Sequence, residues 1–560
     1  MRSPPPSIRF GPAERRANLE KLAAETFDLL VIGGGVTGAA VAWDAALRGF
    51  RVALVEKDDY ASGTSSRSSK LIHGGLRYLE HFDFRLVFEA LRERQTLIKT
   101  APHLIEPEVF LFPIYKGNRT GPLLLRLGLA VYDVLAGFRS IGRRKRLKVS
   151  DAAEIEPLLD RSGLRALASY YDGKTNDARH TISIIRSAVA TGATAVNYTR
   201  VTALSGADSG RITGARARDE LSGSELEIRA HTTANCTGVW TGAILGMVEE
   251  GLSGFLRPSK GSHLVFERER LPVRNSIIFE SSVDGRVMFV IPWGWFTLVG
   301  TTEVPFDGSP DEVYASPDEV TYLLESVNRL MPAAELGGAD ISATYAGLRP
   351  LVAEEGKGAG ATSREHTILD VPDNLFTIVG GKYTTHRLMA EELVDKVVPR
   401  LRHQFGVGAR NACVTRDTPV VGAPRHKRVS ALVAEAGDRA RALGLPDESG
   451  LHLARRYGTE YRAVLRLIED DPELGALLAP PLPYSRAEAL YAVEMEMTQT
   501  LTDFMTLRTH LIYAGGLENP AVARRAAEAM AGPLGWDSPR VEREIELYTG
   551  ERERRRAALG

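Results

Sequence analysis

The chain has 560 residues and a mass of 61.1 kDa, and its 70 Lys and Arg balance 71 Asp and Glu for a formal net charge of -1. At about 150 residues per domain, this length predicts two to four domains. A chain of this size buries enough surface to need neither disulfides nor a structural metal. The balanced charge argues against a nucleic-acid-binding protein, which usually carries a positive excess.

The cysteines and the apolar segments indicate the cellular compartment of the protein. Cys236 and Cys413 are the two cysteines, and neither belongs to a CxxC pair or a Cys/His cluster, so we expect no metal site. Two lone cysteines fit a reducing compartment, with one disulfide left open. Residues 1–26 lack the apolar core of a signal peptide. Charges interrupt residues 123–138, the nearest approach to a membrane span. We expect a cytoplasmic protein, with attachment to the inner membrane surface left open.

The N-terminal region predicts a short helix and then a βαβ unit. Pro12 stands where the first turn of a helix over residues 13–25 would begin. The βαβ unit that follows has a strand, an alanine-rich helix ended by Gly49, and a second strand, at residues 27–32, 39–48 and 51–55.

Glycines Gly33, Gly35 and Gly38 stand in G-x-G-x-x-G spacing between this strand and helix. The first permits a tight turn, the second lets backbone approach a pyrophosphate, and the third lets helix and strand pack closely. The helix N-terminus then offers N–H groups to the phosphates. Glu56 ends the second strand, 18 residues after Gly38, where a carboxylate accepts hydrogen bonds from ribose hydroxyls and repels a 2′-phosphate. These parts together predict a dinucleotide site that disfavours NADP.

Two later segments distinguish FAD from NAD. Residues 233–238 end in a small-residue turn, and residues 376–382 form a strand that ends in a glycine pair. Each alone is more often a plain strand end. In this order and at this separation they resemble the second and third flavin contacts of the FAD-dependent D-amino-acid-oxidase-like fold.

The rest of the chain shows two further sequence patterns, one typical of strands and one typical of helices. Up to about residue 380, short runs rich in Val, Ile and Thr alternate with glycine turns, which predicts mixed sheets. From about 405 to 560, apolar residues recur at helical spacing, as in 453–468 and 501–511. We expect an α/β and α+β protein in which a Rossmann-like FAD-binding domain carries an inserted mixed-sheet substrate domain, followed by an all-helical domain. The expected boundaries are 1–26 for the leader and short helix, 27–400 for the interleaved FAD- and substrate-binding region, and 405–540 for the helical domain.

Several long motifs resemble the aerobic, FAD-dependent glycerol-3-phosphate dehydrogenase family. They are the βαβ unit 27–56 with TSSRSSKLIHGGLRYL (64–79), KGSH (260–263), AGLRPL (346–351) and GGKYTT (380–385). The resemblance spans roughly residues 27–530. It implies oxidation of sn-glycerol 3-phosphate to dihydroxyacetone phosphate, with electrons passed through FAD to a membrane quinone. A homodimer is left open.

The implied substrate is a small dianion, and arginine suits phosphate because its planar fork donates two parallel hydrogen bonds. A single arginine in an apolar setting is more often part of a structural ion pair, and for Arg364 a surface salt bridge is nearly as good an explanation. With the resemblance, the substrate-binding residues are expected to be Arg77, Tyr78, Arg349 and Arg364.

His263 and Lys382 complete the expected catalytic group with Arg349. A neutral imidazole can accept the C2 hydroxyl proton, and the ordinary histidine pKa near 6.5 suits work at neutral pH. A histidine at the start of a strand is otherwise usually structural. Lys382 could stabilise the anionic reduced flavin, or it could simply begin a helix in solvent.

The resemblance also implies the flavin contacts. His73 is expected to contact the flavin rather than accept the substrate proton, with a plain buried histidine as the alternative, and no covalent flavin link is assigned. The expected cofactor-binding residues are Gly33, Gly35, Gly38, Glu56, Thr64, Ser65, Ser66, Leu71, His73, Gly238, Gly381, Lys382 and Thr384.

An apolar segment at 123–132 precedes six cations in residues 139–148. This pattern fits a peripheral contact with an anionic lipid surface, although a core helix followed by a solvated basic loop competes with it. The cations are Arg139, Arg143, Arg144, Lys145, Arg146 and Lys148.

Two other functions stay open at this point. Glycerol-3-phosphate oxidases resemble this chain but are longer, through a segment for which we see no counterpart. A flavin-binding protein without turnover, acting through partners of its helical domain, would have no need of both Arg349 and His263. Bleaching of the flavin band by glycerol 3-phosphate without oxygen would exclude this last function.

Overall fold

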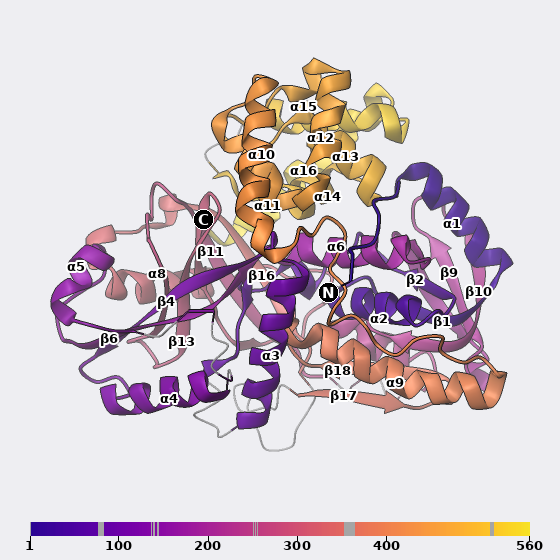
Figure 1. Ribbon diagram of the computed structural model, residues 1–560, viewed down its shortest axis with the longest axis horizontal. Helices are drawn as coiled ribbons and strands as arrows, with labels where there is room; N and C mark the ends of the chain where they lie inside the picture. Colours follow the sequence, from indigo (N-terminus) through magenta and orange to yellow (C-terminus); the bar gives the residue numbers. More distant parts are fainter. Residues whose placement is uncertain are drawn as a thin grey trace.

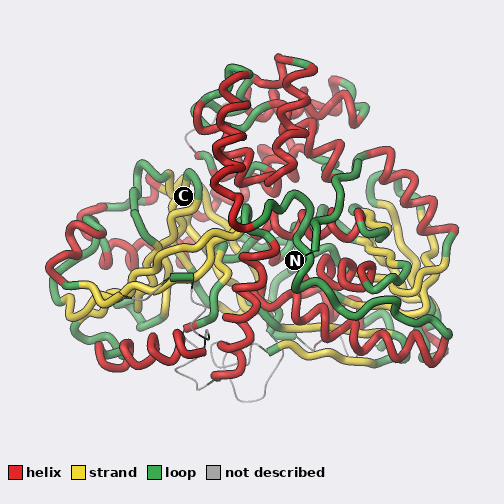
Figure 2. Tube along the Cα trace, viewed as in Figure 1, coloured by secondary structure: helices red, strands yellow, loops and turns green. Residues whose placement is uncertain are grey.

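A computed structural model describes residues 2–76, 83–135, 137, 141–142, 145–249, 251, 254, 256–351, 365–515 and 520–559. Two β-sheets lie on either side of the molecule, and a group of helices stands above them (Figure 1). Figure 2 shows the strands gathered in these two regions, with helices between and above them. The expected combination of a Rossmann-like part, a mixed-sheet part and a helical part is confirmed.

The first sheet carries the βαβ unit at its centre. Strand β1 (Thr26–Ile32) pairs in parallel with β2 on one side and with β10 on the other. The order β17-β18-β10-β1-β2-β7 brings together strands far apart in sequence, with β8 and β9 attached beside β10. The remaining strands are β2 (Val52–Val55), β7 (Thr194–Val196), β8 (Thr199–Ser205), β9 (Gly214–Asp219), β10 (Glu225–Asn235), β17 (His366–Asp370) and β18 (Leu375–Gly380).

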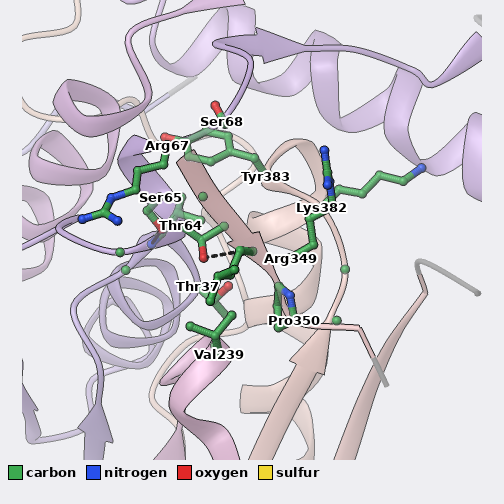
Figure 3. Close-up of a pocket in the computed structure, with 18 of the residues that line it drawn as sticks. Thr37, Thr64, Ser65, Arg67, Ser68, Val239, Arg349, Pro350, Lys382 and Tyr383 are labelled. Carbon is green, nitrogen blue, oxygen red and sulfur yellow. Dashed lines mark hydrogen bonds between the residues drawn. The ribbon is translucent and has the colours of Figure 1, made fainter. Parts of the chain in front are cut away.

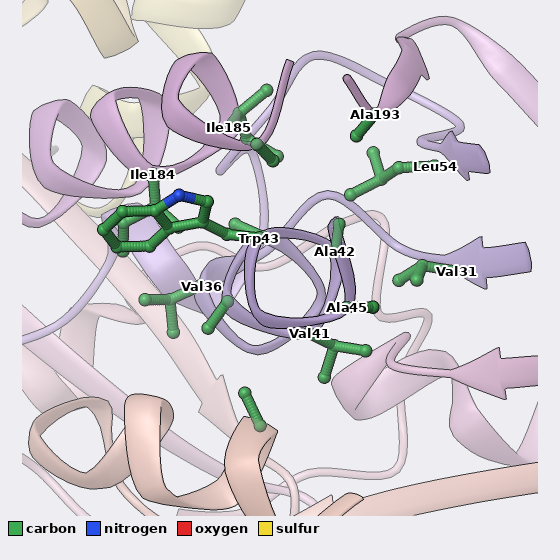
Figure 4. Packing of buried hydrophobic residues seen from close by; sticks show 14 of the residues in the cluster. Val31, Val36, Val41, Ala42, Trp43, Ala45, Leu54, Ile184, Ile185 and Ala193 are labelled. Atoms are coloured by element: carbon green, nitrogen blue, oxygen red, sulfur yellow. The ribbon is translucent and has the colours of Figure 1, made fainter. Parts of the chain in front are cut away.

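Helix α2 (Val36–Leu47) packs between this sheet and two other helices, α6 (Asp177–Ala190) and α9 (His386–Phe405). Figure 4 shows Trp43 of α2 beside Ile184 of α6, while Val41 and Ala45 point elsewhere into the same core. Small alanines allow these close approaches, so the alanine-rich sequence becomes a helix buried on nearly every side. Tight packing on all sides fixes the N-terminus of the helix and with it the glycine turn that directly precedes it.

Among the described residues, the second sheet has ten strands and is mostly antiparallel, with β12 and β4 paired in parallel. Helices α3 (Phe84–Thr100), α4 (Pro122–Leu135), α5 (Ala152–Ile155) and α8 (Pro317–Leu330) surround it. Its strands are β3 (Leu71–Ile72), β4 (Ile105–Tyr115), β5 (Lys145–Leu147), β6 (Leu164–Thr175), β11 (Ser259–Glu267), β12 (Ser276–Glu280), β13 (Val287–Trp293), β14 (Phe296–Gly300), β15 (Val304–Pro305) and β16 (Ile341–Arg349).

The C-terminal region is helical and is tied to the first sheet by buried ion pairs. Arg508 Nη1 lies 2.7 Å from Asp59 Oδ2, and Arg179 pairs with Glu496, all without appreciable exposure. Breaking a buried pair by removing one partner costs about 3–5 kcal/mol, because the other charge stays buried. The helices are α10 (Val429–Ala442), α11 (Asp447–Tyr457), α12 (Tyr461–Asp470), α13 (Arg486–Glu496), α14 (Leu501–Asp503), α15 (Pro520–Leu534) and α16 (Ser538–Arg556).

One local expectation needs correction. The helical spacing at 501–511 does not give one helix: α14 is short, and a π-turn (Phe504–Arg508) and a separate 3-10 turn (Leu511–Tyr513) follow it. The N-terminal helix α1 spans Pro12–Ala24, so Pro12 is its first residue. Both cysteines are free, so the open disulfide does not form. None of the described helices is both long and apolar enough to cross a bilayer.

Candidate functional site

A cavity of about 680 Å³ lies where the two sheets meet. Its walls come from the turn before α2, the loop 62–76, strands β11 and β16, and residues 380–384. Figure 3 shows Arg67 on one side of this cavity and Arg349 and Lys382 on the other. Its volume is within the range of about 300–1,000 Å³ found for ligand pockets.

The glycine turn is shaped so that larger residues do not fit. Gly33 has φ +109°, and a Cβ there would lie 2.7 Å from the Cys236 carbonyl oxygen. A Cβ on Gly38 would lie 1.9 Å from the Gly33 carbonyl oxygen, so Gly38 packs helix against strand and does not line the cavity. Gly35 faces the cavity, and its added Cβ would meet only Ser65 Oγ, at 3.0 Å. Val36 N donates to the same hydroxyl at 2.8 Å.

Glu56 lies at the end of β2, as expected, and its carboxylate closes one end of the glycine turn. It accepts hydrogen bonds from Gly34 N at 2.6 Å and from Asp58 N at 3.0 Å. Burial raises the pKa of Glu56 to about 7, although both backbone donors act in the opposite direction. Ribose hydroxyls would add donors to this carboxylate and favour its charged form.

Most of the other expected cofactor contacts reach the cavity. Thr384 Oγ1 is bonded to the backbone of His73, accepting from its N at 3.2 Å, which ties the third segment to the loop 62–76. Ser66 is an exception, since its buried hydroxyl donates to Gly63 O instead of reaching the cavity. The expected residues that line the cavity are Gly33, Gly35, Glu56, Thr64, Ser65, Leu71, His73, Gly238, Gly381, Lys382 and Thr384.

His263 lies in the middle of β11 rather than at its start, and only 3% of it is exposed. Its ring stacks on Tyr345 of β16, with centroids 4.6 Å apart and planes 7° apart. Its Nε2 lies 2.9 Å from Ser69 Oγ. Burial, together with the nearby cations Arg349 and Lys70, holds the pKa of His263 well below 6.5. The expectation of an ordinary histidine pKa is therefore wrong, because the ring is buried among positive charges.

Arg349 ends β16 and faces the cavity beside the β11 glycine Gly261. Its Nη2 donates to Thr301 Oγ1 at 3.2 Å and to Thr302 O at 3.3 Å. A Cβ on Gly261 would lie 2.6 Å from this Nη2. The glycine in KGSH therefore leaves room for the guanidinium.

Lys382 lines the same cavity and follows two glycines with positive φ. A Cβ on Gly381 would lie 2.4 Å from Met389 Sδ, so this turn also needs glycine. Arg77, Tyr78 and Arg364 lie outside the described residues, and their expected roles stay predictions.

Sequence reasoning missed a buried support beneath the site. Lys70 Nζ lies 2.8 Å from Asp177 Oδ1, and both side chains are completely buried. The same ammonium lies 5.2 Å from the centroid of the Tyr345 ring. Ser69 and Lys70 belong to the 64–79 motif, which was the only sequence feature that could have pointed to them. Their partners lie far away in sequence, so the contacts could not be predicted from the motif. Among the residues described, no group of His, Cys, Asp and Glu side chains is arranged to hold a metal ion.

Comparisons with known proteins identify the family of the chain. A family model described as FAD dependent oxidoreductase matches residues 28–396, and one for the C-terminal domain of alpha-glycerophosphate oxidase matches residues 413–541. The chain is 35% identical over 545 residues to a glycerol-3-phosphate dehydrogenase of Synechocystis, covering 95% of this chain and 97% of the relative. It is 36% identical over 507 residues to the aerobic glycerol-3-phosphate dehydrogenase of Bacillus subtilis, covering 90% and 91%.

A solved structure extends the likeness to the whole fold. The glycerol-3-phosphate dehydrogenase of Bacillus halodurans, complexed with FAD, superposes with a TM-score of 0.80 at 29% identity and covers 98% of each chain.

The cavity in this chain suits FAD on its own geometry. Gly35 leaves the phosphate approach open, the half-buried Glu56 carboxylate lines the same cavity, and the cavity continues from there to His263 and Lys382. FAD is therefore the cofactor, and the chain belongs to the FAD-dependent glycerol-3-phosphate dehydrogenase family.

Proposed function

We propose that this protein oxidises sn-glycerol 3-phosphate to dihydroxyacetone phosphate and delivers the electrons to a membrane quinone. The observation that carries the proposal is the meeting of His263 and Arg349, on the paired strands β11 and β16, in the cavity that also contains the glycine turn. A proton acceptor and a phosphate-binding cation are the two groups that this substrate requires of the protein.

Arg349 is proposed to hold the substrate phosphate with Lys382. The guanidinium donates to a hydroxyl and a carbonyl, and these two contacts orient it beside the cavity. Arg67 also lines the cavity and was not expected from the sequence. Burial and Arg555 lower the pKa of Arg67, so an anion in the cavity would be stabilised by a poorly solvated cation.

His263 is proposed to accept the proton of the C2 hydroxyl. Burial and neighbouring cations keep its ring neutral near pH 7, which is the form that accepts a proton. The bound flavin would supply the acceptor for the hydride that leaves C2. A phosphate dianion beside Arg349 would offset part of the positive charge that now opposes protonation of the ring.

Variants of these two residues test the proposal. Arg349→Ala should lower kcat/KM for glycerol 3-phosphate by at least a hundredfold, since a desolvated charge-assisted contact contributes about 3 kcal/mol. Arg349→Lys should recover part of this loss, and flavin content should stay normal in both. His263→Asn should slow flavin reduction by about a hundredfold. His73→Asn is the matched comparison, and a larger loss there would move the proton acceptor to His73.

The electron acceptor is proposed to be a membrane quinone, reached through an apolar surface on α3 and α4. Helix α4 buries Leu125, Leu129 and Tyr132 against the protein. Its other face leaves apolar side chains in solvent, and two phenylalanines of the neighbouring helix α3 are also exposed. Figure 1 shows α3 and α4 on the same side of the molecule. The exposed residues are Phe84, Phe88, Leu123, Leu124, Leu127 and Val134, with exposed fractions of 44%, 46%, 78%, 54%, 61% and 59%.

This surface suits a lipid interface, because large apolar side chains enter it while nearby cations meet anionic head groups. Lys145, Arg146 and Lys148 are exposed beyond α4, and the other cations of the cluster lie outside the described residues. Leu124→Ser with Leu127→Ser should release the protein from anionic vesicles and lower quinone reduction, while dye-linked activity persists. Wild-type protein that never sediments with such vesicles would contradict the attachment.

A glycerol-3-phosphate oxidase is the second candidate, favoured by the match of residues 413–541 to the alpha-glycerophosphate oxidase domain. Rates with a quinone analogue and with oxygen separate the two. We expect the quinone analogue to reoxidise the flavin much faster than air does. Stoichiometric peroxide at an equal rate would favour the oxidase.

A further inference from the structure

The segment 306–316 connects the two halves of the molecule. It joins β15 of the second sheet to α8, which packs on the same sheet. Phe306 N donates to Pro258 O at 3.1 Å, and Lys260 Nζ donates to Tyr314 O at 3.1 Å, so both ends of the segment are held beside the start of β11. Between these two ends, Asp311 contacts residues that follow strands of the first sheet.

Asp311 binds two side chains of the FAD-binding part through one carboxylate oxygen. Its Oδ1 accepts hydrogen bonds from Lys57 Nζ at 2.6 Å and from Trp240 Nε1 at 3.1 Å. Lys57 comes directly after Glu56, and Trp240 ends the short turn that follows β10. The ammonium lies 4.6 Å from the centroid of the indole, so the three side chains form one compact group.

Apolar packing supports the same junction. Val313 is buried in a cluster with Val239 and Leu348, and Phe306 and Trp240 pack against this cluster. Val239 is among the residues that line the cavity (Figure 3). The segment is therefore held against the FAD-binding part by apolar contacts as well as by Asp311.

Lys57 and Trp240 form part of the wall of the cavity that takes FAD. They line it together with Glu56, the expected contact for a ribose, whereas Asp311 is not a lining residue. A Cβ on Gly63 would lie 2.9 Å from the Trp240 ring, so the indole also packs closely against the loop 62–76. A lysine side chain that is free to rotate loses this freedom when a ligand packs against it, which weakens binding. Asp311 fixes the ammonium and the indole before the cofactor arrives.

We propose that Asp311 is a cofactor-retaining residue, which holds Lys57 and Trp240 in place at the end of the FAD cavity beside Glu56 and so slows the release of FAD. Without Asp311, the indole N–H loses its acceptor, and Lys57 is held only by Asp58, whose Oδ2 lies 2.6 Å from its Nζ. The inference depends on FAD as the cofactor and not on the substrate or the electron acceptor. A purely electrostatic role predicts the opposite effect, because the loss of a negative charge near the FAD phosphates would strengthen binding.

The test measures the release of FAD from the holoenzyme, followed by the rise in free-flavin fluorescence after dilution into flavin-free buffer. Asp311→Ala should release FAD about three to ten times faster than wild type, as expected for the loss of one partly exposed ion pair and one further hydrogen bond. Asp307→Ala is the matched control, because it removes the same charge from an exposed position of the same segment. Asp307 has no hydrogen bond or ion pair with any described residue.

A double-mutant cycle shows whether Asp311 acts through Lys57. The acceleration caused by Asp311→Ala should be several times smaller when Lys57 is already alanine. Urea unfolding of the flavin-free proteins should give the same stability for wild type and Asp311→Ala, because the Asp311 side chain is 52% exposed.

Four results would overturn the proposal. They are unchanged or slower release from Asp311→Ala, an equal acceleration in Asp307→Ala, additive effects of Lys57→Ala and Asp311→Ala, and a loss of stability in flavin-free Asp311→Ala. None of these measurements involves glycerol 3-phosphate, so their failure is distinct from a failure of the proposed function.

Discussion

Replacement of Gly261 by alanine would test whether Arg349 must occupy its present position. The added Cβ would lie 2.6 Å from both Arg349 Nη2 and Thr301 Oγ1. Ordinary contact begins near 3.4 Å, so the guanidinium must move by about 0.8 Å. Because both atoms belong to side chains, the strand can accommodate the change without unfolding. The cost should therefore appear in catalysis rather than in stability.

A displacement of about 1 Å in a positioned group can cost roughly a hundredfold in rate. We expect Gly261→Ala to lower kcat/KM for glycerol 3-phosphate by ten- to a hundredfold, corresponding to about 1.4–3 kcal/mol at 1.4 kcal/mol per factor of ten. The assay is dye-linked oxidation with flavin content measured in the same samples. Gly437→Ala is the matched control, because it lies in α10 with no atom within 4 Å of its added Cβ. Wild-type kcat/KM in Gly261→Ala would show that Arg349 can move without loss of function.

Three further predictions follow from the cofactor cradle and the buried histidines. Gly35→Leu should give protein with little bound FAD, checked by its visible spectrum after purification, since the larger side chain fills the phosphate approach. FAD affinity, followed by quenching of flavin fluorescence, should tighten as pH rises through about 7, where Glu56 loses its proton, and Glu56→Gln should remove this dependence. His386 has a folded pKa lowered to about 4 by burial and an ordinary unfolded value near 6.5, so the unfolded state binds its proton first as pH falls. The free energy of unfolding should drop by about 2 kcal/mol between pH 7 and 5 from this residue alone. His103, with a pKa lowered to about 3, should add a loss of the same sign. Urea unfolding at pH 7 and pH 5 measures this change in the free energy of unfolding for wild type and His386→Asn. An equal change in both proteins would contradict the assignment to His386.

The glycine turn and Glu56 could be predicted because the residues that form them lie close together in the sequence. Gly33, Gly35 and Gly38 follow a strand and begin a helix, and no remote contact is needed to recognise the turn. Glu56 follows the second strand of the same βαβ unit, so its position could also be predicted from the local sequence. The structure agrees with the expected packing role of Gly38, whose partner is the Gly33 carbonyl, and adds that neither Gly38 nor Ser66 lines the cavity.

The arrangement around His263 could not be predicted in this way. Its stacking on Tyr345 depends on the antiparallel register of β11 and β16, and its hydrogen bond to Ser69 joins residues 194 positions apart. The pKa of His263 is lowered because the ring is buried near Lys70, and this burial depends on the same long-range contacts.

Helix α4 shows a different limit of sequence patterns. No clean apolar stripe is visible in its sequence because both of its faces are apolar. Leu125 and Leu129 turn inward, while Leu123 and Leu127 remain exposed. The sequence pattern alone therefore does not tell which apolar positions of this helix are buried.

We expect the bound flavin and the proposed glycerol 3-phosphate site to share one cavity around His263 and Arg349. Anaerobic addition of glycerol 3-phosphate to the purified holoenzyme tests it most directly, with the visible flavin band as the readout. We predict rapid and complete bleaching by glycerol 3-phosphate, little bleaching by glycerol at the same concentration, and slow bleaching in Arg349→Ala. A flavin band that glycerol 3-phosphate leaves unchanged, or that glycerol bleaches equally well, would contradict the account.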